Sequence, residues 1–351
     1  MGFLKHLLSP IQIIYSLIIM IRNKLYDLTI LSSYTAPVIT ISVGNMKNGG
    51  TGKTPMVEYL IHLFKHKKIG ILSRGYKRKT KGFILANKYH TAKDIGDENY
   101  QLYNKYRDII IAADNNRVHG IKKILNIDNS LNLIILDDAF QHRSLNRDVD
   151  ILLTEYNDLF INDQLMPIGQ LREHKKEMKR ADIIVITKSP KNISQDLRQI
   201  IINKLKPYIH QKVYFSYIKE YKYIDMSLSK KIEINRNEKH ILITGIANAN
   251  PLLDFLNHTQ IKYAHINFND HYNFQASDIN KIIMMKEQNN MSDNLLLTEK
   301  DYYRLDLIDK KTLKKTFNIV CVQIKIDFIE VDKPNFNNQL LKFEQTQTQI
   351  I

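Results

Sequence analysis

Hydrophobic positions follow two alternating patterns through the first 190 residues: short β-branched runs and stretches with helical spacing. Several runs are apolar almost throughout, which is typical of parallel strands buried on both faces of a sheet. Alternation of such strands with helices predicts a doubly wound α/β domain with a mostly parallel sheet. The predicted strands are residues 36–43, 68–73, 108–113, 131–138, 149–154 and 182–187.

The pattern weakens between residues 190 and 235, where KEYKYIDMSLSKKIEINRNEK is polar and predicts a connection with a hairpin-like part. Strand–turn–helix spacing resumes at 239–256, and further strands are predicted near 261–267, 294–298 and 317–328. This predicts a second, smaller α/β unit. The expected boundaries are an N-terminal helix at 1–30, a nucleotide-binding domain at 31–205, a linker at 206–235 and the smaller domain at 236–351.

The N-terminus, MGFLKHLLSPIQIIYSLIIMIRNKLYDL, has an apolar body flanked by Lys5, His6, Arg22 and Lys24. Its interrupted apolar stretch is shorter than the roughly 20 residues that a spanning helix needs, and no small-residue cleavage site follows it. Cations around an apolar body suit a helix that lies in a membrane interface, against anionic headgroups. A buried first helix of the domain is the open alternative.

Composition and charge exclude some kinds of site but do not identify a partner. The formal net charge of +15 favours anionic partners such as nucleic acid, phospholipid or a phosphorylated substrate. Richness in Ile, Asn, Lys and Tyr without Trp also indicates AT-rich coding, which adds lysine without a functional reason, so the charge selects no partner. The single cysteine, Cys321, excludes a disulfide framework and a multi-cysteine zinc site.

The first strand leads into KNGGTGKTP and then into an apolar-faced helix, which is the context of a phosphate-binding loop. Gly49, Gly50 and Gly52 allow backbone N–H groups to curl around a phosphate at the helix N-terminus. Lys53 is expected to reach the β and γ phosphates of a nucleotide, and the hydroxyl of Thr54 to bind Mg²⁺. Thr51 completes this cradle, and Lys47 and Asn48 at its start are also expected to contact the nucleotide.

The loop departs from the usual pattern at its start, where Lys47 replaces the first glycine. We expect Gly44, at the end of the strand, to permit the turn instead. A lysine directly before the glycine pair marks partitioning-type and maturation-factor ATPases, but that position is Asn48 here. A switch ATPase of that kind is a competing hypothesis.

The segment LIILDDAFQHR places polar side chains at the end of another apolar strand. Asp137 and Asp138 are adjacent carboxylates, one of which can hold Mg²⁺ or its water shell. Gln141 and His142 follow at the carboxyl end of the strand, where ligands bind in open α/β sheets. The alternative is a helix N-cap with a solvated acidic pair.

Two further polar clusters are ambiguous by themselves. SRGYKRKTKG carries Arg74 and other cations that fit an anionic substrate or a solvated loop. DIGDENY places Asp97 and Glu98 before a helical stretch, which in isolation indicates a helix cap.

An ordered set of motifs resembles the tetraacyldisaccharide 4′-kinases of lipid A synthesis across about residues 36 to 304. The motifs are SVGNMKNGGTGKTP, LSRGY, GDE, LDDAFQHR with LNRDVDILL, GQLREHKKEMKRAD, ITGIANANP, NDHYNF and TEKDYYRL. The resemblance implies a P-loop kinase that uses ATP and Mg²⁺ to phosphorylate the 4′-hydroxyl of a tetraacyl glucosamine disaccharide 1-phosphate, giving lipid IVA. It also implies a membrane-associated N-terminal helix at the cytoplasmic face of the bacterial inner membrane, and we expect a monomer.

The resemblance assigns roles to individual residues. It makes Asp97 the base that takes the hydroxyl proton and His271, in NDHYNF, its partner. It gives Asp138, with Asp137, the magnesium and nucleotide role. Four residues match family positions near the phosphates: Gln141, His142, Arg172 and Glu173. Arg117 more loosely matches a family arginine.

A nucleic-acid-binding ATPase is the third hypothesis, because aromatics interleave with basic residues in KEYKYID and could stack on bases. Helicase and RNA-binding motifs are absent from the sequence, so we expect no nucleic-acid partner.

Overall fold

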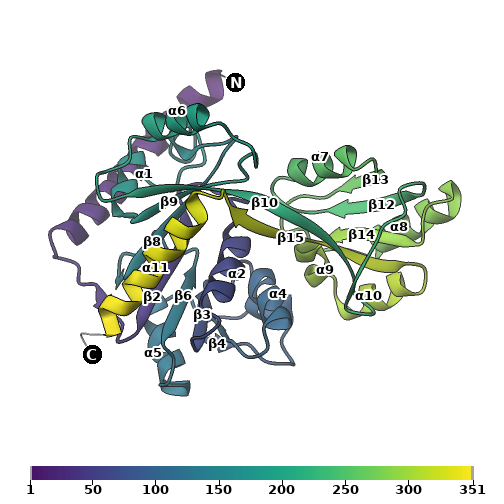
Figure 1. Ribbon diagram of the computed structural model, residues 1–351, viewed down its shortest axis with the longest axis horizontal. Coiled ribbons are helices and arrows are strands. Elements are labelled where there is room, and N and C mark those ends of the chain that lie inside the picture. Colours follow the sequence, from purple (N-terminus) through teal and green to yellow (C-terminus); the bar gives the residue numbers. More distant parts are fainter. Residues whose placement is uncertain (1, 349–351) are drawn as a thin grey trace.

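The computed structural model describes the backbone of residues 2–348 and the side chains of residues 9–343. Two α/β units lie side by side, the larger on the left and the smaller on the right of Figure 1. The predicted α/β class with a mostly parallel sheet is confirmed.

All six strands predicted for the larger unit are present. They form a parallel array in the order β9-β8-β2-β6-β3-β5, and the short β4 (Ile84–Leu85) pairs antiparallel at the edge. A separate pair joins β1 (Tyr34–Thr35) to β7 (Leu145–Asn146). The bounds are β2 Ile39–Asn45, β3 Ile69–Ser73, β5 Ile110–Ala113, β6 Leu133–Asp137, β8 Val149–Glu155 and β9 Ile183–Thr187.

Helices and two 3-10 turns cover this sheet. Val57, Leu60 and Ile61, at helical spacing on α2, are buried in the main core against the sheet, as their pattern predicts. The bounds are α2 Lys53–Leu63, α3 Ala92–Ile95, α4 Asp97–Lys105, α5 Arg117–Ile127, α6 Gln195–Leu205, η1 Phe160–Asn162 and η2 Lys175–Arg180.

The smaller unit has the parallel order β13-β12-β14-β15, and its three further strands also match their predictions. Buried leucines and isoleucines of β12 and β14 form its core with α8 and α10. The bounds are β12 Lys239–Thr244, β13 Lys262–Asn267, β14 Asn294–Thr298, α7 Asn250–His258, α8 Ala276–Asn289, α9 Glu299–Arg304 and α10 Leu307–Lys314.

A long antiparallel ribbon joins the units, where the sequence predicts only a polar linker with a hairpin-like part. The first residues of β10 (Lys212–Asp225) pair with β9, and the rest pair with β15 (Asn318–Phe328). The hairpin-like part is real, because β11 (Lys230–Ile232) folds back on β10. Figure 1 shows the ribbon running from one unit to the other.

The chain returns to the larger unit at its end. Phe336 and Leu340, on α11 (Asp332–Thr348), are buried in the same core as Val57 of α2. The packing therefore differs from the expected 236–351 boundary, because α11 and the end of β15 join the core of the larger unit.

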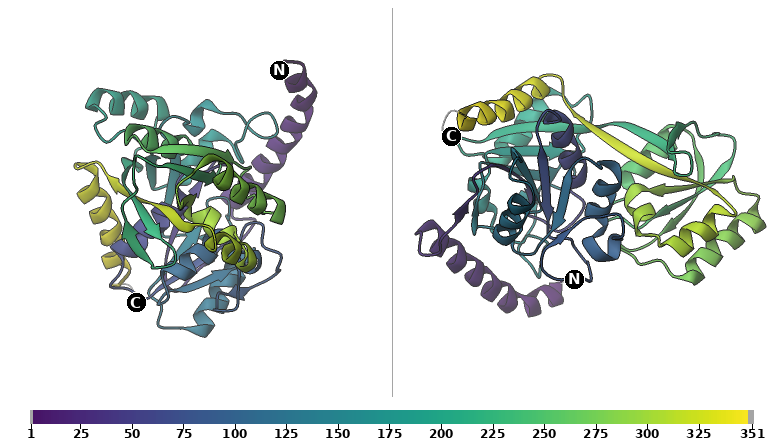
Figure 2. Two further views of the ribbon diagram at one scale, coloured as in Figure 1. Left: turned by 90° about the vertical axis from the view of Figure 1, so that its right-hand side faces the viewer. Right: turned by 90° about the horizontal axis from the view of Figure 1, so that it is seen from below.

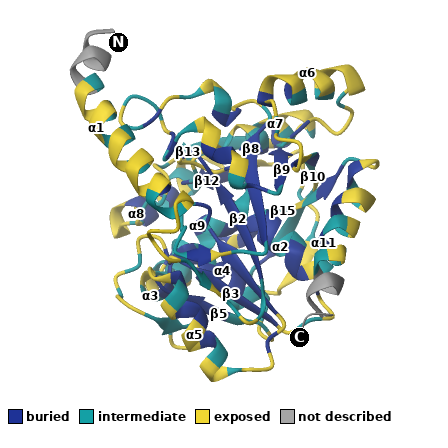
Figure 3. Ribbon diagram, turned by 90° about the vertical axis from the view of Figure 1, so that its left-hand side faces the viewer, coloured by how far each residue is buried: buried dark blue, intermediate teal, exposed yellow. Residues whose placement is uncertain are grey.

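The first helix, α1 (Gly2–Asp27), lies along the outside of the larger unit in both views of Figure 2. One face is tied to the segment 163–180, through Tyr15 Oη donating to the carbonyl of Arg172 and a Ser16–His174 hydrogen bond. Its other face exposes Ile11, Ile13, Ile14, Leu17, Ile18, Met20 and Ile21 (Figure 3). These exposures contradict the buried-helix alternative. The side chains of Lys5 and His6 lie outside the described residues.

The helices described by the structure include none that is long and apolar enough to cross a membrane.

Candidate active site

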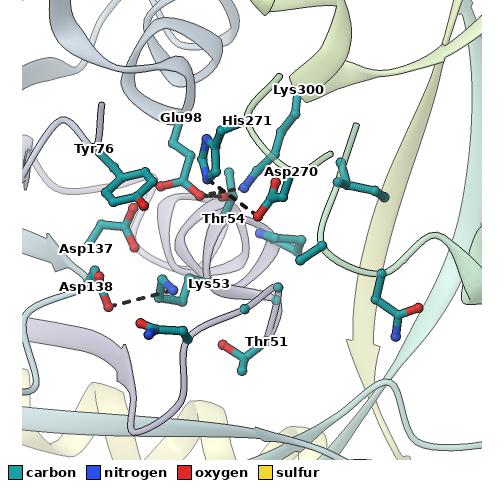
Figure 4. Close-up of a pocket in the computed structure, with 18 of the residues that line it drawn as sticks. Thr51, Lys53, Thr54, Tyr76, Glu98, Asp137, Asp138, Asp270, His271 and Lys300 are labelled. Carbon is teal, nitrogen blue, oxygen red and sulfur yellow. Dashed lines mark hydrogen bonds and ion pairs between the residues drawn. The ribbon is translucent and has the colours of Figure 1, made fainter. Parts of the chain in front are cut away.

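A cavity of about 820 Å³ lies between the two units, at the carboxyl ends of β2, β3 and β6. Its walls come from the glycine loop, α4, the Asp137–His142 segment, α1, the ribbon and α9. Figure 4 shows side chains from both units pointing into it. This is the position at which open α/β sheets bind ligands.

The glycine loop, residues 47–54, follows β2 and begins α2. Gly49 and Gly52 have φ of 128° and 88°, a backbone region that other residues rarely adopt. Every predicted position from Asn48 to Thr54 lines the cavity: Asn48, Gly49, Gly50, Thr51, Gly52, Lys53 and Thr54.

Two expectations about the start of this loop are wrong. Gly44 does not begin the turn, because β2 continues through Asn45. A side chain there would instead meet Cβ of Phe140 at 2.6 Å, so the glycine is needed for close packing. Lys47 does not face the cavity, because its ammonium pairs with Asp158 at 2.5 Å and Asp163 at 2.9 Å.

Lys53 and Thr54 both point into the cavity. The Lys53 ammonium lies 3.7 Å from Asp138 and 3.5 Å from the side-chain oxygen of Asn45. The Thr54 hydroxyl donates to Glu98 at 3.4 Å. A cationic group and a hydroxyl therefore face the same space as the backbone of the loop.

The two adjacent aspartates have opposite surroundings. Burial, with the nearby charge of Glu98, raises the pKa of Asp137 to about 7, and its Oδ1 lacks a hydrogen-bond partner among the described residues. Asp138 is half-buried, and the charges of Lys53 and Arg172 outweigh the effect of its partial burial and lower its pKa to about 2. Asp138 has φ of 53°, a strained conformation for a residue other than glycine.

The four residues predicted near the phosphates all line the cavity. Arg172 binds Asp138 at 2.9 Å and the side-chain oxygen of Asn48 at 2.9 Å. Gln141 donates to Glu173 at 2.9 Å. Burial, with the charge of Arg117, lowers the pKa of His142 to about 3, so this imidazole is neutral at pH 7.

Arg117 lies behind this wall instead of in it. It is 1% exposed and donates to the carbonyls of Asp114 and Asp137. Its guanidinium therefore supports the turn that carries the two aspartates.

Asp97 and His271 meet across the boundary between the units, as expected. His271 Nδ1 lies 3.0 Å from Asp97 Oδ2. Burial alone would raise the pKa of Asp97, but the hydrogen bond from His271 and the charges of Lys300 and Arg304 hold it well below its usual value. His271 lines the cavity, whereas Asp97 lies behind it.

Sequence reasoning assigned no role to three other members of this cluster. Lys300 donates to Glu98 at 2.6 Å and lines the cavity. Arg304 donates to Asp97 at 2.8 Å. The ring of Tyr76 lies 4.8 Å from that of His271. These residues belong to TEKDYYRL and LSRGY, motifs that support the family resemblance but do not by themselves indicate a role for each side chain.

Comparisons with known proteins agree with this geometry. The profile of the family described as tetraacyldisaccharide-1-P 4′-kinase matches residues 4–345. The tetraacyldisaccharide 4′-kinase of Flavobacterium johnsoniae is 38% identical over 347 residues, covering 98% of each chain. That of Cytophaga hutchinsonii is 39% identical over 333 residues, covering 93% of each chain.

A solved structure extends the match to three dimensions. The structure of LpxK from Aquifex aeolicus in complex with ATP superposes with a TM-score of 0.75 at 28% identity. The match covers 97% of this chain and 99% of that one. On the family profile and these relatives, the chain belongs to the tetraacyldisaccharide-1-P 4′-kinase family.

Proposed function

We propose that this protein transfers the γ-phosphoryl group of ATP to the 4′-hydroxyl of a tetraacyldisaccharide 1-phosphate in lipid A synthesis. The observation that carries the proposal is the Asp97–His271 pair, whose imidazole lines the same cavity as Lys53 and Thr54. A carboxylate–imidazole pair next to a phosphate cradle suits activation of a hydroxyl for phosphoryl transfer.

The nucleotide would bind with its phosphates on the glycine loop, which is of P-loop type in this proposal. Backbone N–H groups of residues 49–54 and the N-terminus of α2 favour anions there. The far end of the cavity is apolar and lies against the ribbon and the smaller unit, as a purine base requires. Its lining residues are Ile218, Tyr221, Leu252, Val322 and Ile324.

Magnesium fits the same end of the cavity as the phosphates. The buried, unpartnered Oδ1 of Asp137 and the hydroxyl of Thr54 are oxygen donors of the kind that Mg²⁺ prefers. Asp138 is engaged by Lys53 and Arg172, so we assign the metal to Asp137. Bound Mg²⁺ would neutralise charge on the β and γ phosphates.

Proton transfer is assigned to the imidazole. Oδ2 of Asp97 already accepts hydrogen bonds from His271 and Arg304, and its low pKa makes it a weak base. With Nδ1 donating to Asp97, Nε2 of His271 keeps a lone pair that can accept the proton of the 4′-hydroxyl, and Asp270 Oδ2 lies 3.7 Å from it. We therefore reverse the expected roles, with His271 as base and Asp97 as the group that orients it.

In the transfer step, one O–H bond and one P–O bond break and a new P–O bond forms. The hydroxyl O–H bond breaks and its proton passes to His271 Nε2, while the oxygen forms a bond to the γ phosphorus. The bond from that phosphorus to the β–γ bridging oxygen breaks, and ADP leaves. Arg172 and Lys53 lie where they can stabilise the charge of the transferred group.

We also propose that α1 holds the enzyme at an anionic membrane surface, on the cytoplasmic face of the bacterial inner membrane. Its exposed apolar face supports this, because such a face on an exposed helix suits an interface. Tyr15, Ile19 and Arg22 of α1 also line the active-site cavity, which connects that face to the catalytic groups.

The central test uses purified protein, Mg²⁺, γ-labelled ATP and the tetraacyldisaccharide 1-phosphate in mixed micelles. We expect label in the lipid, and none when the 4′-hydroxyl of the same lipid is methylated. Absence of transfer, or equal transfer to the methylated lipid, contradicts the proposal.

The membrane proposal has a separate test. Substituting Ile14 and Ile18 with Gln should weaken binding to anionic vesicles about tenfold per residue, because each isoleucine contributes about 1.5 kcal/mol of apolar transfer. Leu197→Gln with Ile200→Gln is the matched control, since these side chains are exposed on α6. Equal weakening by both pairs would argue against α1 as the membrane contact.

A further inference from the structure

Arg304 is a buried cation that touches both members of the catalytic pair. Its side chain is 5% exposed, and Nε donates to Asp97 Oδ2 at 2.8 Å. One terminal nitrogen lies 3.4 Å from His271 Nδ1 and 3.6 Å from Asp270. Arg304 is not among the residues that line the cavity, so it acts behind the reacting groups.

The same guanidinium is fixed to the loop that carries His271. Its other terminal nitrogen donates to the carbonyl of Gly245 and lies 3.1 Å from Asp301. The Gly245 carbonyl also accepts a hydrogen bond from the backbone N–H of His271, at 3.3 Å. Arg304 therefore connects the histidine loop of the smaller unit to Asp97 of the larger one.

These contacts decide which nitrogen of His271 carries the proton. Arg304 can only donate, so it would need a lone pair on Nδ1, whereas Asp97 needs a proton on Nδ1. The shorter contact is with the carboxylate, at 3.0 Å. Nδ1 therefore carries the proton, and Arg304 acts on the pair through Asp97 and through its charge.

We propose that Arg304 is a positioning residue, which holds Asp97 against His271 across the boundary between the units and leaves Nε2 of His271 available as the base. This inference rests on the proposed kinase reaction and deepens it. The Asp97–His271 pair would then be a three-residue unit that is complete only when α9 is docked on α4.

The charge of Arg304 gives this role a distinct signature. The groups that face the His271 ring are Asp97 from α4, Asp270 from its own loop, Arg304 from α9 and the Tyr76 ring. Removing a cation from this set stabilises the imidazolium, so the base stays protonated to higher pH. The acidic limb of the pH–rate profile should therefore move to higher pH.

The test compares Arg304→Gln and Arg304→Lys with the full-length enzyme in the micelle assay. R304Q should lower kcat about 10–100-fold through misplacement of the pair, with the KM for ATP unchanged. Its acidic limb should move to higher pH, while that of R304K, which keeps the charge, should stay in place. Lys311→Gln removes an exposed charge from the adjacent helix α10 and should leave activity unchanged.

Wild-type kcat in R304Q, or a lowered kcat with an unmoved acidic limb, would overturn the proposal in favour of a merely structural arginine. If R304Q does not fold, R304K decides, because it loses the Nε contact to Asp97 and must lower kcat several-fold. An inactive wild-type enzyme would instead contradict the proposed function, before the variants are compared.

Discussion

The two walls of the cavity are built in different ways. The phosphate wall comes from consecutive residues of one strand, loop and helix, Asn48 to Thr54. The proton-transfer wall joins α4, the His271 loop and α9, which belong to two units. A wall made of consecutive residues depends on local folding, whereas the other exists only while the units are docked. Phosphate binding by the loop should therefore survive point changes that abolish proton transfer.

The largest effect on activity is expected from a substitution in the proton-transfer wall. His271→Gln should lower kcat for lipid phosphorylation about 10³-fold, because it removes the group that accepts the hydroxyl proton. ATP affinity, measured by calorimetry, should stay near that of the wild type. His258→Gln on α7 is the matched control, since that side chain is exposed. A parallel loss of ATP affinity would show that the two walls are not independent.

The phosphate wall should respond differently. Lys53→Ala should lower kcat about 10²–10³-fold and also weaken ATP binding, because its charge serves the phosphates before and during transfer. Lys65→Ala, at an exposed position just after α2, is the control. Unchanged ATP affinity in Lys53→Ala would contradict the division between the walls.

Docking of the units can be tested without touching either wall's reacting groups. Lys105 on α4 binds Glu58 at 2.8 Å and Glu299 of α9 at 3.1 Å. Lys105→Met leaves the buried Glu299 and the half-buried Glu58 without their cation, which should cost about 3 kcal/mol of unfolding free energy. The exposed Lys93–Asp306 pair, also across the boundary, is 4.0 Å long, so Lys93→Met should cost under about 1 kcal/mol.

The stability lost in Lys105→Met should depend on pH, with a sign that follows from the pKa of Glu299. Burial already raises the pKa of Glu299 to about 7, above its value in the unfolded chain. A raised carboxyl pKa gives stability at low pH that is lost as pH rises toward 7. The deficit of Lys105→Met in chemical denaturation should therefore shrink as the pH is lowered from 8 to 6. A deficit that grows on acidification would contradict this assignment.

The smallest predicted effect is on the affinity for Mg²⁺–ATP. Burial, with the charge of Glu98, holds the pKa of Asp137 at about 7, so the metal must displace a proton below that pH. The affinity for Mg²⁺–ATP should fall up to about tenfold per pH unit below 7, and Asp137→Asn should remove that dependence. Arg117→Lys, behind the same turn, tests whether distortion alone has this effect. A pH-independent affinity in the wild type would argue against Asp137 as the ligand.

Much of the phosphate wall could be predicted from sequence. The apolar runs predicted the positions of the strands, and the loop motif predicted that Lys53 and Thr54 face the site. Gly44 was wrongly assigned to the turn and Lys47 to nucleotide binding, because both lie next to the glycine loop in the sequence. Their roles depend on Asp158, Asp163 and Phe140, which approach only in the folded chain.

The proton-transfer wall could not be predicted from local sequence patterns. The pairing of Asp97 with His271 came from a family resemblance, and Arg304 was passed over because its burial depends on docking of α9. The segment that forms β10 was predicted to be part of a linker because Lys219, Glu220 and Lys222 make its second half polar. Its pairing with β15 is a long-range contact that periodicity cannot reveal.

The return of the chain to the larger unit has a consequence for the order of synthesis. The smaller unit lies between β10 and β15 in the sequence, so it is complete as soon as β15 emerges from the ribosome. Phe336 and Leu340, which also belong to the core that contains α2, emerge later. The ATP-binding side, which is encoded first, is thus the last part of the enzyme to finish its core. A nascent chain that stalls before residue 340 would carry the glycine loop on an unfinished core.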